Sequence, residues 1–344
     1  QTRAEAPAAA PRISARSVMP NEAPVADRAG KASRLRGDRV VAAAVAWWRA
    51  QAGKKRFLWV HLYDPHAPYL PPEPFAQRFR GQPKDLYQGE VAATDSFLAP
   101  LLEPFLAGKE KPALVVVTAD HGESLGAHGE LTHGLFAYEE TLKVPLVVWG
   151  KGVGTGLDSR AARHVDIAPT ILEALGLAKP NASPGRSLLA PEVPGEPSYF
   201  EALSTNLNRG WAPLRGVLAD RKKLIELPLA ELYDLDRDPT EQKNVLSAKP
   251  EVATSLRKRL ARESVWPPQR TAEPSSEEIA QLRSLGYTSG SAAPKSSYSP
   301  EDDPKKLIVL DRKLQDVVEA YTRGNYDLAV KLAREVAIAR PSMS

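Results

Sequence analysis

The chain has 344 residues, of which 42% are hydrophobic and 26% are charged, so it can bury a full core and belongs to the ordinary globular class. Its formal charge of +4 is spread over interleaved acidic and basic residues, which gives no reason to expect nucleic-acid binding. The absence of cysteine excludes disulfides, thiolate metal sites and a cysteine nucleophile within the chain, and no apolar stretch reaches the roughly 18 residues of a membrane span.

The first part of the chain changes from an irregular segment to helix and strand patterns. Residues 1–35 are rich in Ala, Pro and Arg without periodicity, which predicts a linker or a truncated end. The apolar spacing of residues 37–52 predicts a helix, and FLWV at 57–60 predicts a buried strand that runs on to residue 63. A second helix is expected at 90–107, although its two prolines should bend or shorten it.

The alternation of strands and helices continues along the chain. LVVV at 114–117 and VPLVVWG at 144–150 predict buried strands, with a short helix around 135–142 between them. DIAPTILEALGL at 166–177 predicts an amphipathic helix that is closed by glycine. This order predicts an α/β fold with a doubly wound, mostly parallel sheet over residues 36–183.

After residue 184 the pattern changes to short apolar segments separated by turn residues. Residues 184–290 are predicted to form a C-terminal subdomain with a small antiparallel sheet and a helix near 250–263. Frequent Pro and Ser predict a flexible linker at 291–304.

Residues 305–344 contain two helical patterns joined at Gly324–Asn325. The spacing of Gly, Tyr, Ala and Pro is that of one tetratricopeptide (TPR) unit, which predicts a helical-hairpin tail that binds a protein partner. The alternative is a helical hairpin that packs on the main domain.

All six histidines lie between residues 61 and 164, and five of them lie in two short segments. These segments are HLYDPHAPY at 61–69 and DHGESLGAHGELTH at 120–133, and each follows a predicted strand. Because ligands bind at the carboxyl ends of the strands in open α/β sheets, the clustering indicates a functional site.

Asp120 and His121 place a carboxylate beside an imidazole at the end of a predicted strand. Oxygen and nitrogen ligands together suit a divalent cation, whereas the alternative interpretation is a helix N-cap followed by a surface histidine. The two loops add further candidate ligands and proton donors: Asp64, His66, His128 and His133.

Five blocks of the sequence resemble the sulfatases, a branch of the alkaline-phosphatase superfamily. They occur in the family's order over about residues 37–290: HLYDPHAPY, YQGEVAATD, TADHGESLGAHGELTHGLFAYEETLKVPLVVWG, HVDIAPTILEALGL and ELYDLDRDPTEQKNV. The segment RSLGY at 283–287, followed by a repeat-like tail, is also similar to many bacterial sulfatase-like proteins. The resemblance implies an alkaline-phosphatase-like core and the hydrolysis of sulfate esters.

The resemblance implies that Asp120 and His121 are the second pair of metal ligands, where many sulfatases have Asp-Asn and bind calcium. Since imidazole is a poor calcium ligand, the histidine favours manganese, zinc or magnesium as the one divalent ion. The same departure leaves the choice between sulfate and phosphate esters open.

The resemblance also implies roles for the other candidates. His66 matches the histidine that binds the sulfuryl oxygens and protonates the leaving alcohol, with Asp64 holding it in place. His133 stands where the family has a lysine, and it can replace that lysine only when protonated or hydrogen-bonded, which predicts a pH dependence. We therefore assign His66 and His133 as catalytic residues and Asp64 and His128 as substrate-positioning residues.

The nucleophile of the family is missing from its expected place, which is upstream of the strand at 57–63. The family uses Cys or Ser in a Cys/Ser-x-Pro-x-Arg motif, and the nearest segment, ASPGR at 182–186, has Ala182 at that position. Asp302-Asp303 is not the missing first metal pair either, because it is expected in a solvated turn of the linker. The chain is therefore predicted to be the C-terminal part of a sulfatase-like enzyme and to be inactive alone.

Two further functions stay open at this point. A phosphoric ester or phosphonate hydrolase, or a phosphotransferase, of the same superfamily would also use Asp120, His121 and His133. A non-catalytic binding protein with a repeat tail would have lost the metal site. The substrate is expected to be a small-molecule or glycan ester, and the family resemblance implies a periplasmic or extracellular location.

Overall fold

The computed structural model describes residues 35–110, 114–150, 152–180, 183–191, 196–263 and 295–341. The chain divides into two compact units, residues 1–110 and residues 111–344. We expected boundaries near residues 183 and 290 instead. Residues 135–138 pack in one core with Phe200 and Trp211, so the segments before and after residue 183 share one unit. The predicted linker at 1–35 lies almost entirely outside the described residues, as do Ala182 and the RSLGY segment.

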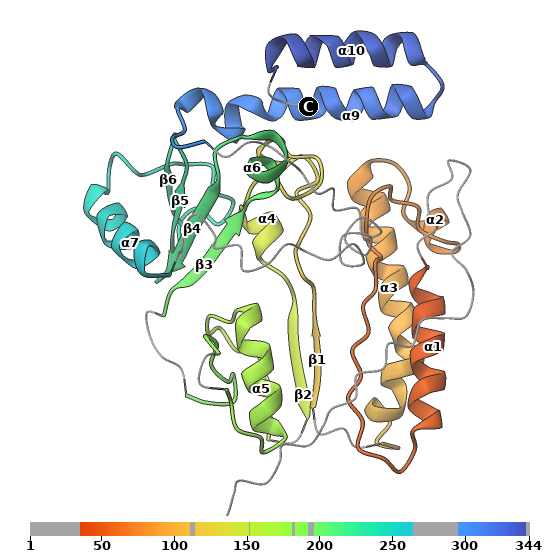
Figure 1. Cartoon of the computed structure of the whole chain (residues 1–344). Helices are drawn as coiled ribbons and strands as arrows, with labels where there is room; N and C mark the ends of the chain where they lie inside the picture. The colour runs from red at the N-terminus through yellow and green to blue at the C-terminus, as the bar shows by residue number, and fades with distance from the viewer. Residues whose placement is uncertain are drawn as a thin grey trace, which may run out of the picture. The chain divides into compact units, whose positions relative to one another are not determined.

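The first unit is built on two long helices, α1 (Gly37–Ala50) and α3 (Pro83–Leu106), with the short α2 (Phe75–Arg78) before α3 (Figure 1). Helix α1 forms as predicted, since its apolar spacing buries Val41 and Ala44 on one face. Helix α3 starts earlier than expected and continues through both of its prolines to Leu106. Its first turn is closed by a capping box between Gln82 and Asp85.

The predicted strand at 57–63 is not a strand in the described residues. The segment has no strand assignment, and the side chains of Phe57 and Trp59 are 61% and 81% exposed. A β-strand needs a hydrogen-bonded neighbour, and the described part of this unit offers none. The segment is apolar, as its composition indicates, but the prediction of a paired and buried strand is wrong.

The second unit begins with the strands β1 (Leu114–Thr118) and β2 (Leu146–Gly150), which pair antiparallel with Val116 opposite Val148. This corrects the expected mostly parallel sheet, because both sheets of the described residues are antiparallel. Parallel neighbours require a crossover connection, usually a helix. Here the connection is an irregular loop with the short turns η1 (Ala127–Gly129) and α4 (Glu139–Leu142), and it returns the chain alongside β1.

The segment after β2 forms the predicted amphipathic helix in a shorter form. The turn η2 (His164–Asp166) leads into α5 (Ile167–Ala174), and Gly176 follows with a positive φ of 68°. That backbone conformation closes helices at little cost only in glycine, so the glycine predicted at the helix end is confirmed.

The small antiparallel sheet predicted after residue 184 is confirmed. Its strands lie in the order of the sequence: β3 (Ser198–Ala202), β4 (Leu214–Ala219), β5 (Lys222–Glu226) and β6 (Glu231–Asp234). The hairpin between β4 and β5 turns at Asp220 and Arg221, which both have positive φ, as a two-residue turn with the twist of the strands requires. Helix α7 (Pro250–Glu263) covers one face through Leu256 and Leu260.

The start of the C-terminal tail is part of the core of the second unit. The turn η3 (Pro300–Asp302) is followed by α9 (Pro304–Thr322), and Leu307 packs with Trp211 and Leu214 in the main apolar cluster. The short α6 (Ser204–Arg209) is tied to α9 by an ion pair between Arg209 and Asp311.

Asp302 and Asp303 are buried, which corrects the expected solvated turn. Asp302 forms ion pairs with Lys295, at 2.7 Å, and with Arg340. Asp303 caps α9 and accepts the backbone N–H of Leu229 at 2.8 Å. The acidic pair therefore fixes the tail to the sheet, and residues 295–303 are not a free linker.

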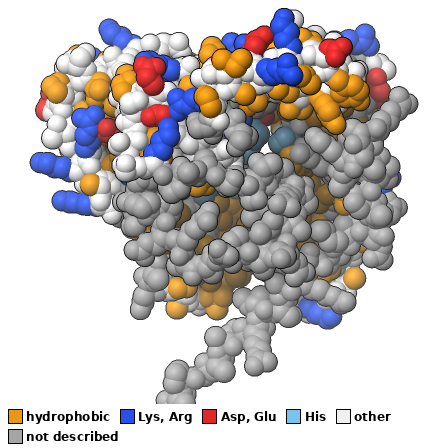
Figure 2. All heavy atoms as spheres, turned by 45° about the horizontal axis from the view of Figure 1, so that its top comes forward, with side chains coloured by type: hydrophobic (Ala, Val, Ile, Leu, Met, Phe, Trp, Pro, Cys, Tyr) orange, Lys and Arg blue, Asp and Glu red, His pale blue; other side chains and the backbone are white. Residues whose placement is uncertain are grey.

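The predicted helical hairpin is confirmed, since α10 (Tyr326–Ala339) follows α9 after a turn at Gly324 and Asn325 and lies beside it (Figure 1). Its outer surface exposes apolar side chains among lysines and arginines, including Val318, Tyr321, Tyr326, Val330 and Ile338 (Figure 2). The packing of Leu307 is what the alternative of a docked hairpin predicts, and the TPR relationship stays a prediction. Among the described helices, none combines the length and apolarity that a bilayer crossing requires.

Candidate functional site

Asp120 and His121 lie just beyond the end of β1, as predicted. The turn is held by two backbone contacts: Gly122 donates its N–H to the Thr141 carbonyl at 2.8 Å, and a ring nitrogen of His164, Nε2, lies 2.8 Å from the Ala119 carbonyl. A Cβ on Gly122 would lie 2.1 Å from the Glu140 carbonyl oxygen. The glycine of the Asp-His-Gly motif is therefore needed because the backbone of α4 approaches this closely.

The geometry of Asp120 and His121 fits a cation. His121 Nδ1 lies 2.9 Å from the Gly122 carbonyl, so donation from Nδ1 leaves the lone pair of Nε2 available as a ligand. His121 Nε2 lies 3.7 Å from Asp120 Oδ2, and the Asp120 side chain is 70% exposed. One metal ion can therefore contact both atoms, and a backbone carbonyl already orients the imidazole.

His133 joins this pair. Its ring lies 4.0 Å from the ring of His121, and its Nδ1 lies 3.1 Å from Glu123 Oε1. Burial disfavours the charged ring, but the Glu123 hydrogen bond and the charges of Glu123, Glu130 and Asp120 outweigh it, so the pKa of His133 is raised. The raised pKa favours the protonated imidazole, and a protonated imidazole is suited to hold an anion.

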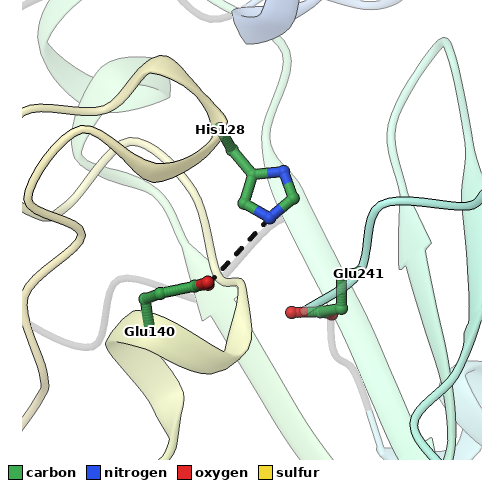
Figure 3. A group of neighbouring side chains, drawn as sticks. All are labelled: His128, Glu140 and Glu241. Atoms are coloured by element: carbon green, nitrogen blue, oxygen red, sulfur yellow. Dashed lines mark ion pairs between the residues drawn. The ribbon is translucent and has the colours of Figure 1, made fainter. Parts of the chain in front are cut away.

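His128 lies in a different cluster. Its ring stacks on Tyr138 with the centroids 3.6 Å apart, and its Nε2 lies 4.0 Å from Glu140 Oε2 (Figure 3). The backbone of His128 has a φ of 50°, which only a few non-glycine residues adopt. The predicted role of His128 in substrate positioning stays a prediction.

Asp64 and His66 lie in the first unit. The Asp64 carboxylate accepts the backbone N–H of Gly37 at 2.9 Å and so serves the start of α1. The ring of His66 lies against the Ala67 carbonyl, at 2.6 Å from Nδ1, and 4.2 Å from the ring of Tyr63. Because these residues and the Asp120 cluster lie in separate units, their grouping in one active site stays a prediction.

Sequence reasoning missed three buried carboxylates that support these loops. Glu90 accepts the backbone N–H groups of His66 and Leu70, and burial raises the pKa of Glu90. Glu123 orients His133, whereas Glu130 accepts the N–H groups of two core residues and is 1% exposed. Glu123 and Glu130 each follow a glycine in a polar loop, a pattern that predicts solvent exposure. Only Glu90 had a signal for a site, because it lies in the block YQGEVAATD.

The ASPGR segment has a structural role in the residues that are described. Arg186 pairs with Glu196 at 2.7 Å, and its backbone N–H is accepted by the buried carboxylate of Asp166. Gly185 lies so close to Val165 that a Cβ would clash with its carbonyl. The arginine is thus committed to packing against η2.

Comparisons with known proteins match most of the described chain. Residues 27–177 match the family model described as Sulfatase, and residues 126–265 match the model described as N-sulphoglucosamine sulphohydrolase, C-terminal. Both matches over residues 27–265 are to sulfatase families, which supports a relationship to the sulfatase/alkaline-phosphatase superfamily. The matches thereby support the resemblance seen in the sequence at the level of the superfamily.

Individual curated sulfatases match parts of the chain. Arylsulfatase K of Bos taurus is 29% identical over 194 residues, which are 51% of this chain and 35% of the relative. Delta 4,5-hexuronate-2-O-sulfatase of Bacteroides thetaiotaomicron is 30% identical over 147 residues, 38% of this chain and 30% of the relative. The chain therefore spans about a third of the length of these curated sulfatases.

Similarity to a solved structure supports an α/β fold with antiparallel sheets. The crystal structure of Ps i-CgsB in complex with k-i-k-neocarrahexaose superimposes with a TM-score of 0.58 at 18% identity. The match covers 73% of this chain and 59% of that structure.

Proposed function

We propose that this chain is the metal-binding part of a sulfatase that hydrolyses sulfate esters. The observation that carries the proposal is the cluster at the end of β1, where Asp120 and His121 present two ligand atoms 3.7 Å apart and the ring of His133 lies 4.0 Å from that of His121. The sulfatase matches over residues 27–265 support the reaction class. When bound, a divalent cation supplies positive charge to the oxygens of the transferred group.

The residues of the chain have separate tasks in this proposal. A sulfate ester carries spread negative charge, and cleavage adds charge to the leaving oxygen. His133, kept cationic by Glu123, binds a non-bridging oxygen of the ester. His66 holds a proton for the leaving alcohol, and Glu90 fixes the loop of His66 through its backbone N–H. Asp64 supports this loop by anchoring it to the start of α1.

The nucleophile is absent from the part of the site that this chain supplies. The sequence contains no Cys/Ser-x-Pro-x-Arg motif, and Arg186 of the nearest similar segment is bound to Glu196. We therefore expect this chain alone to turn over neither an aryl sulfate nor an aryl phosphate when divalent metals are added. Robust turnover of either ester would contradict this part of the proposal.

A phosphate or phosphonate hydrolase is the second candidate. The observation that favours it is His121, a nitrogen ligand that suits zinc or manganese better than calcium. Phosphate monoesters carry more negative charge than sulfate esters. A site that combines a divalent cation, a cationic His133 and an imidazole ligand would therefore prefer phosphate monoesters. The choice between the two functions depends on which ester the metal-loaded chain binds more tightly.

Ester binding tests the proposal without requiring turnover. The chain is loaded with manganese, zinc or calcium in turn, and the binding of 4-nitrophenyl sulfate and 4-nitrophenyl phosphate is measured by calorimetry. We expect metal-dependent binding that Asp120→Asn and His133→Ala weaken and that His61→Ala, an exposed histidine of the other segment, leaves unchanged. A preference for the sulfate supports the sulfatase, and a preference for the phosphate supports the second candidate.

A chain that binds neither ester and no metal at Asp120 and His121 would instead be a non-catalytic binding protein. In that case, the helical hairpin with its exposed apolar side chains would carry the function through a protein partner. An exported location, in the periplasm or outside the cell, is proposed from the family alone.

A further inference from the structure

A second group of metal-ligating side chains lies behind the Asp-His-Gly turn. His128 comes from η1, Glu140 from α4 and Glu241 from the loop after β6, and Figure 3 shows the three side chains pointing toward one another. One ligand atom from each residue lies within 4.8 Å of the other two. Segments more than 100 residues apart therefore converge on a single point.

Two ligand atoms of this group are buried without a hydrogen-bond partner. His128 Nε2 and Glu140 Oε2 have no such partner in the described residues, and solvent does not reach them. They face each other at 4.0 Å, which is too long for a hydrogen bond. Since buried polar atoms are nearly always satisfied, an orphaned pair of this kind calls for an additional ligand.

The charges around the cluster are unbalanced. Among the described residues, Glu139, Glu140 and Glu241 face one cation, the fully buried Lys223, whose Nζ lies 3.3 Å from Glu139 Oε1 and 2.8 Å from Glu241 Oε1. The other neighbours, the rings of Tyr138 and Phe200, carry no charge at neutral pH. Three carboxylates against one lysine leave two negative charges uncompensated, which is the charge of one divalent cation.

We propose that His128, Glu140 and Glu241 bind a divalent transition metal ion, in a site separate from Asp120 and His121. An imidazole with two carboxylates is a donor set that suits zinc and also manganese, and the chain offers no thiolate to compete. Ligand bonds of about 2.0–2.2 Å require the three atoms to move closer together, which rotation of the Glu140 side chain allows. That side chain is 27% exposed and is the entry path for the ion.

The position of this site explains what the ion would do. The backbone of Glu140 is in contact with Gly122, directly behind the ligands of the first site. An ion held by His128, Glu140 and Glu241 would clamp η1, α4 and the loop after β6 together, and so hold the Asp-His-Gly turn in place. Its role is therefore structural, and it does not depend on which ester the protein acts on.

Zinc stoichiometry separates the two sites. The full-length double variant Asp120→Asn/His121→Asn removes the first site, and zinc binding is then measured by calorimetry and by metal analysis after dialysis. We expect the double variant to keep one zinc ion per chain and to melt at a higher temperature with zinc than without it. Adding Glu140→Gln or His128→Gln should abolish both effects.

Matched controls keep the result interpretable. His61→Gln and Glu173→Gln, placed in the same double variant, remove a histidine and a carboxylate away from the cluster and should leave zinc binding unchanged. Circular dichroism establishes that each variant is folded, and Glu140→Gln, which preserves the shape of a partly exposed side chain, serves if His128→Gln does not fold. A cobalt-loaded double variant should show the visible absorption of a four-coordinate site with nitrogen and oxygen ligands.

Two results would overturn the proposal. The first is a double variant that binds no zinc although it is folded, which would mean that only protons balance the cluster. The second is stoichiometric binding that survives Glu140→Gln and His128→Gln equally. A native chain that binds zinc at this site but binds neither ester would count against the proposed function alone.

Discussion

Gly122 shows how a single residue sets the geometry of the first site. Its missing side chain lets the turn after β1 approach the backbone of α4, and the position of a Cβ would fall 2.1 Å from the Glu140 carbonyl oxygen. The obstacle is backbone rather than a flexible side chain, so the turn itself would have to move. Asp120 and His121 lie on that turn, so the proposed metal site should be sensitive to a side chain at Gly122.

Gly122→Ala is expected to weaken metal binding and to destabilise the protein by about 1–3 kcal/mol, because it overpacks a fixed contact. Urea unfolding and zinc titration measure the two effects. Gly154→Ala is the matched control, since open space surrounds Gly154 and its backbone needs no positive φ. Equal stability of both variants would show that the turn tolerates a Cβ.

Glu130 is expected to make stability depend on pH. Burial raises the pKa of Glu130 from its ordinary 4.5 to about 7, although the backbone N–H of Leu135 and the hydroxyl of Ser124 oppose the shift. The folded protein therefore binds a proton more tightly than the unfolded chain does, and its stability falls as the pH rises from 4.5 to 7. The loss attributable to this group is about 3 kcal/mol.

Glu130→Gln resembles the protonated form and should flatten this part of the stability profile. Denaturant unfolding of both proteins at several pH values between 4.5 and 8 measures the difference. The variant should gain relative to the native protein with increasing pH. An unchanged difference across this range would show that Glu130 does not titrate there.

At the scale of elements, the antiparallel sheet was predictable because its strands alternate and its turns are short. The helices α1, α5, α7, α9 and α10 were predictable from apolar spacing and end signals. The antiparallel pairing of β1 and β2 was not, because both strands are continuous apolar runs and direction depends on a loop without periodicity. The strand predicted at 57–63 is wrong for a related reason, since composition indicates an apolar strand but does not show whether a neighbouring strand is present.

Asp303, at the start of α9, attaches the C-terminal hairpin to the rest of the second unit. Asp303→Ala removes the N-cap of α9 and the acceptor of the Leu229 N–H, so the hairpin should detach more readily, at a cost of about 1–2 kcal/mol. Hydrogen exchange of α9 and α10 measures the opening. Asp316→Ala, on the same helix, should leave exchange as it is. Unchanged protection in the Asp303 variant would mean that Leu307 alone holds the tail.

At the scale of the whole molecule, the clustering of three candidate site residues could be predicted and the residues that support them could not. Asp120, His121 and His133 come together as expected, because they follow one strand within a short stretch of sequence. Glu241 lies more than 100 residues from His128, and no local pattern indicates that they meet. The prediction that Asp302 and Asp303 lie in a solvated turn is wrong, because a Pro/Ser-rich sequence gives no indication of the partners that they meet in the fold.

The exposed apolar side chains of the first unit bear on the solution behaviour of the chain. Phe57 and Trp59 are exposed on a segment without a strand partner, so the chain should self-associate as its concentration increases. Phe57→Ser/Trp59→Ser should reduce this association in sedimentation experiments and change stability by less than about 0.5 kcal/mol. Leu157→Ser, at an isolated exposed position, should have no effect. A native chain that stays monomeric at all concentrations would contradict the expectation.

The guanidinium of Arg312 on α9 donates to the carbonyl of Gly129, at 2.8 Å from Nη2, and Gly129 follows His128 directly. A displacement of the hairpin would therefore move the turn that carries His128, because this hydrogen bond connects the two. A protein that grips the tail would act mechanically on the loop between β1 and β2, and Arg312→Ala would disconnect the two.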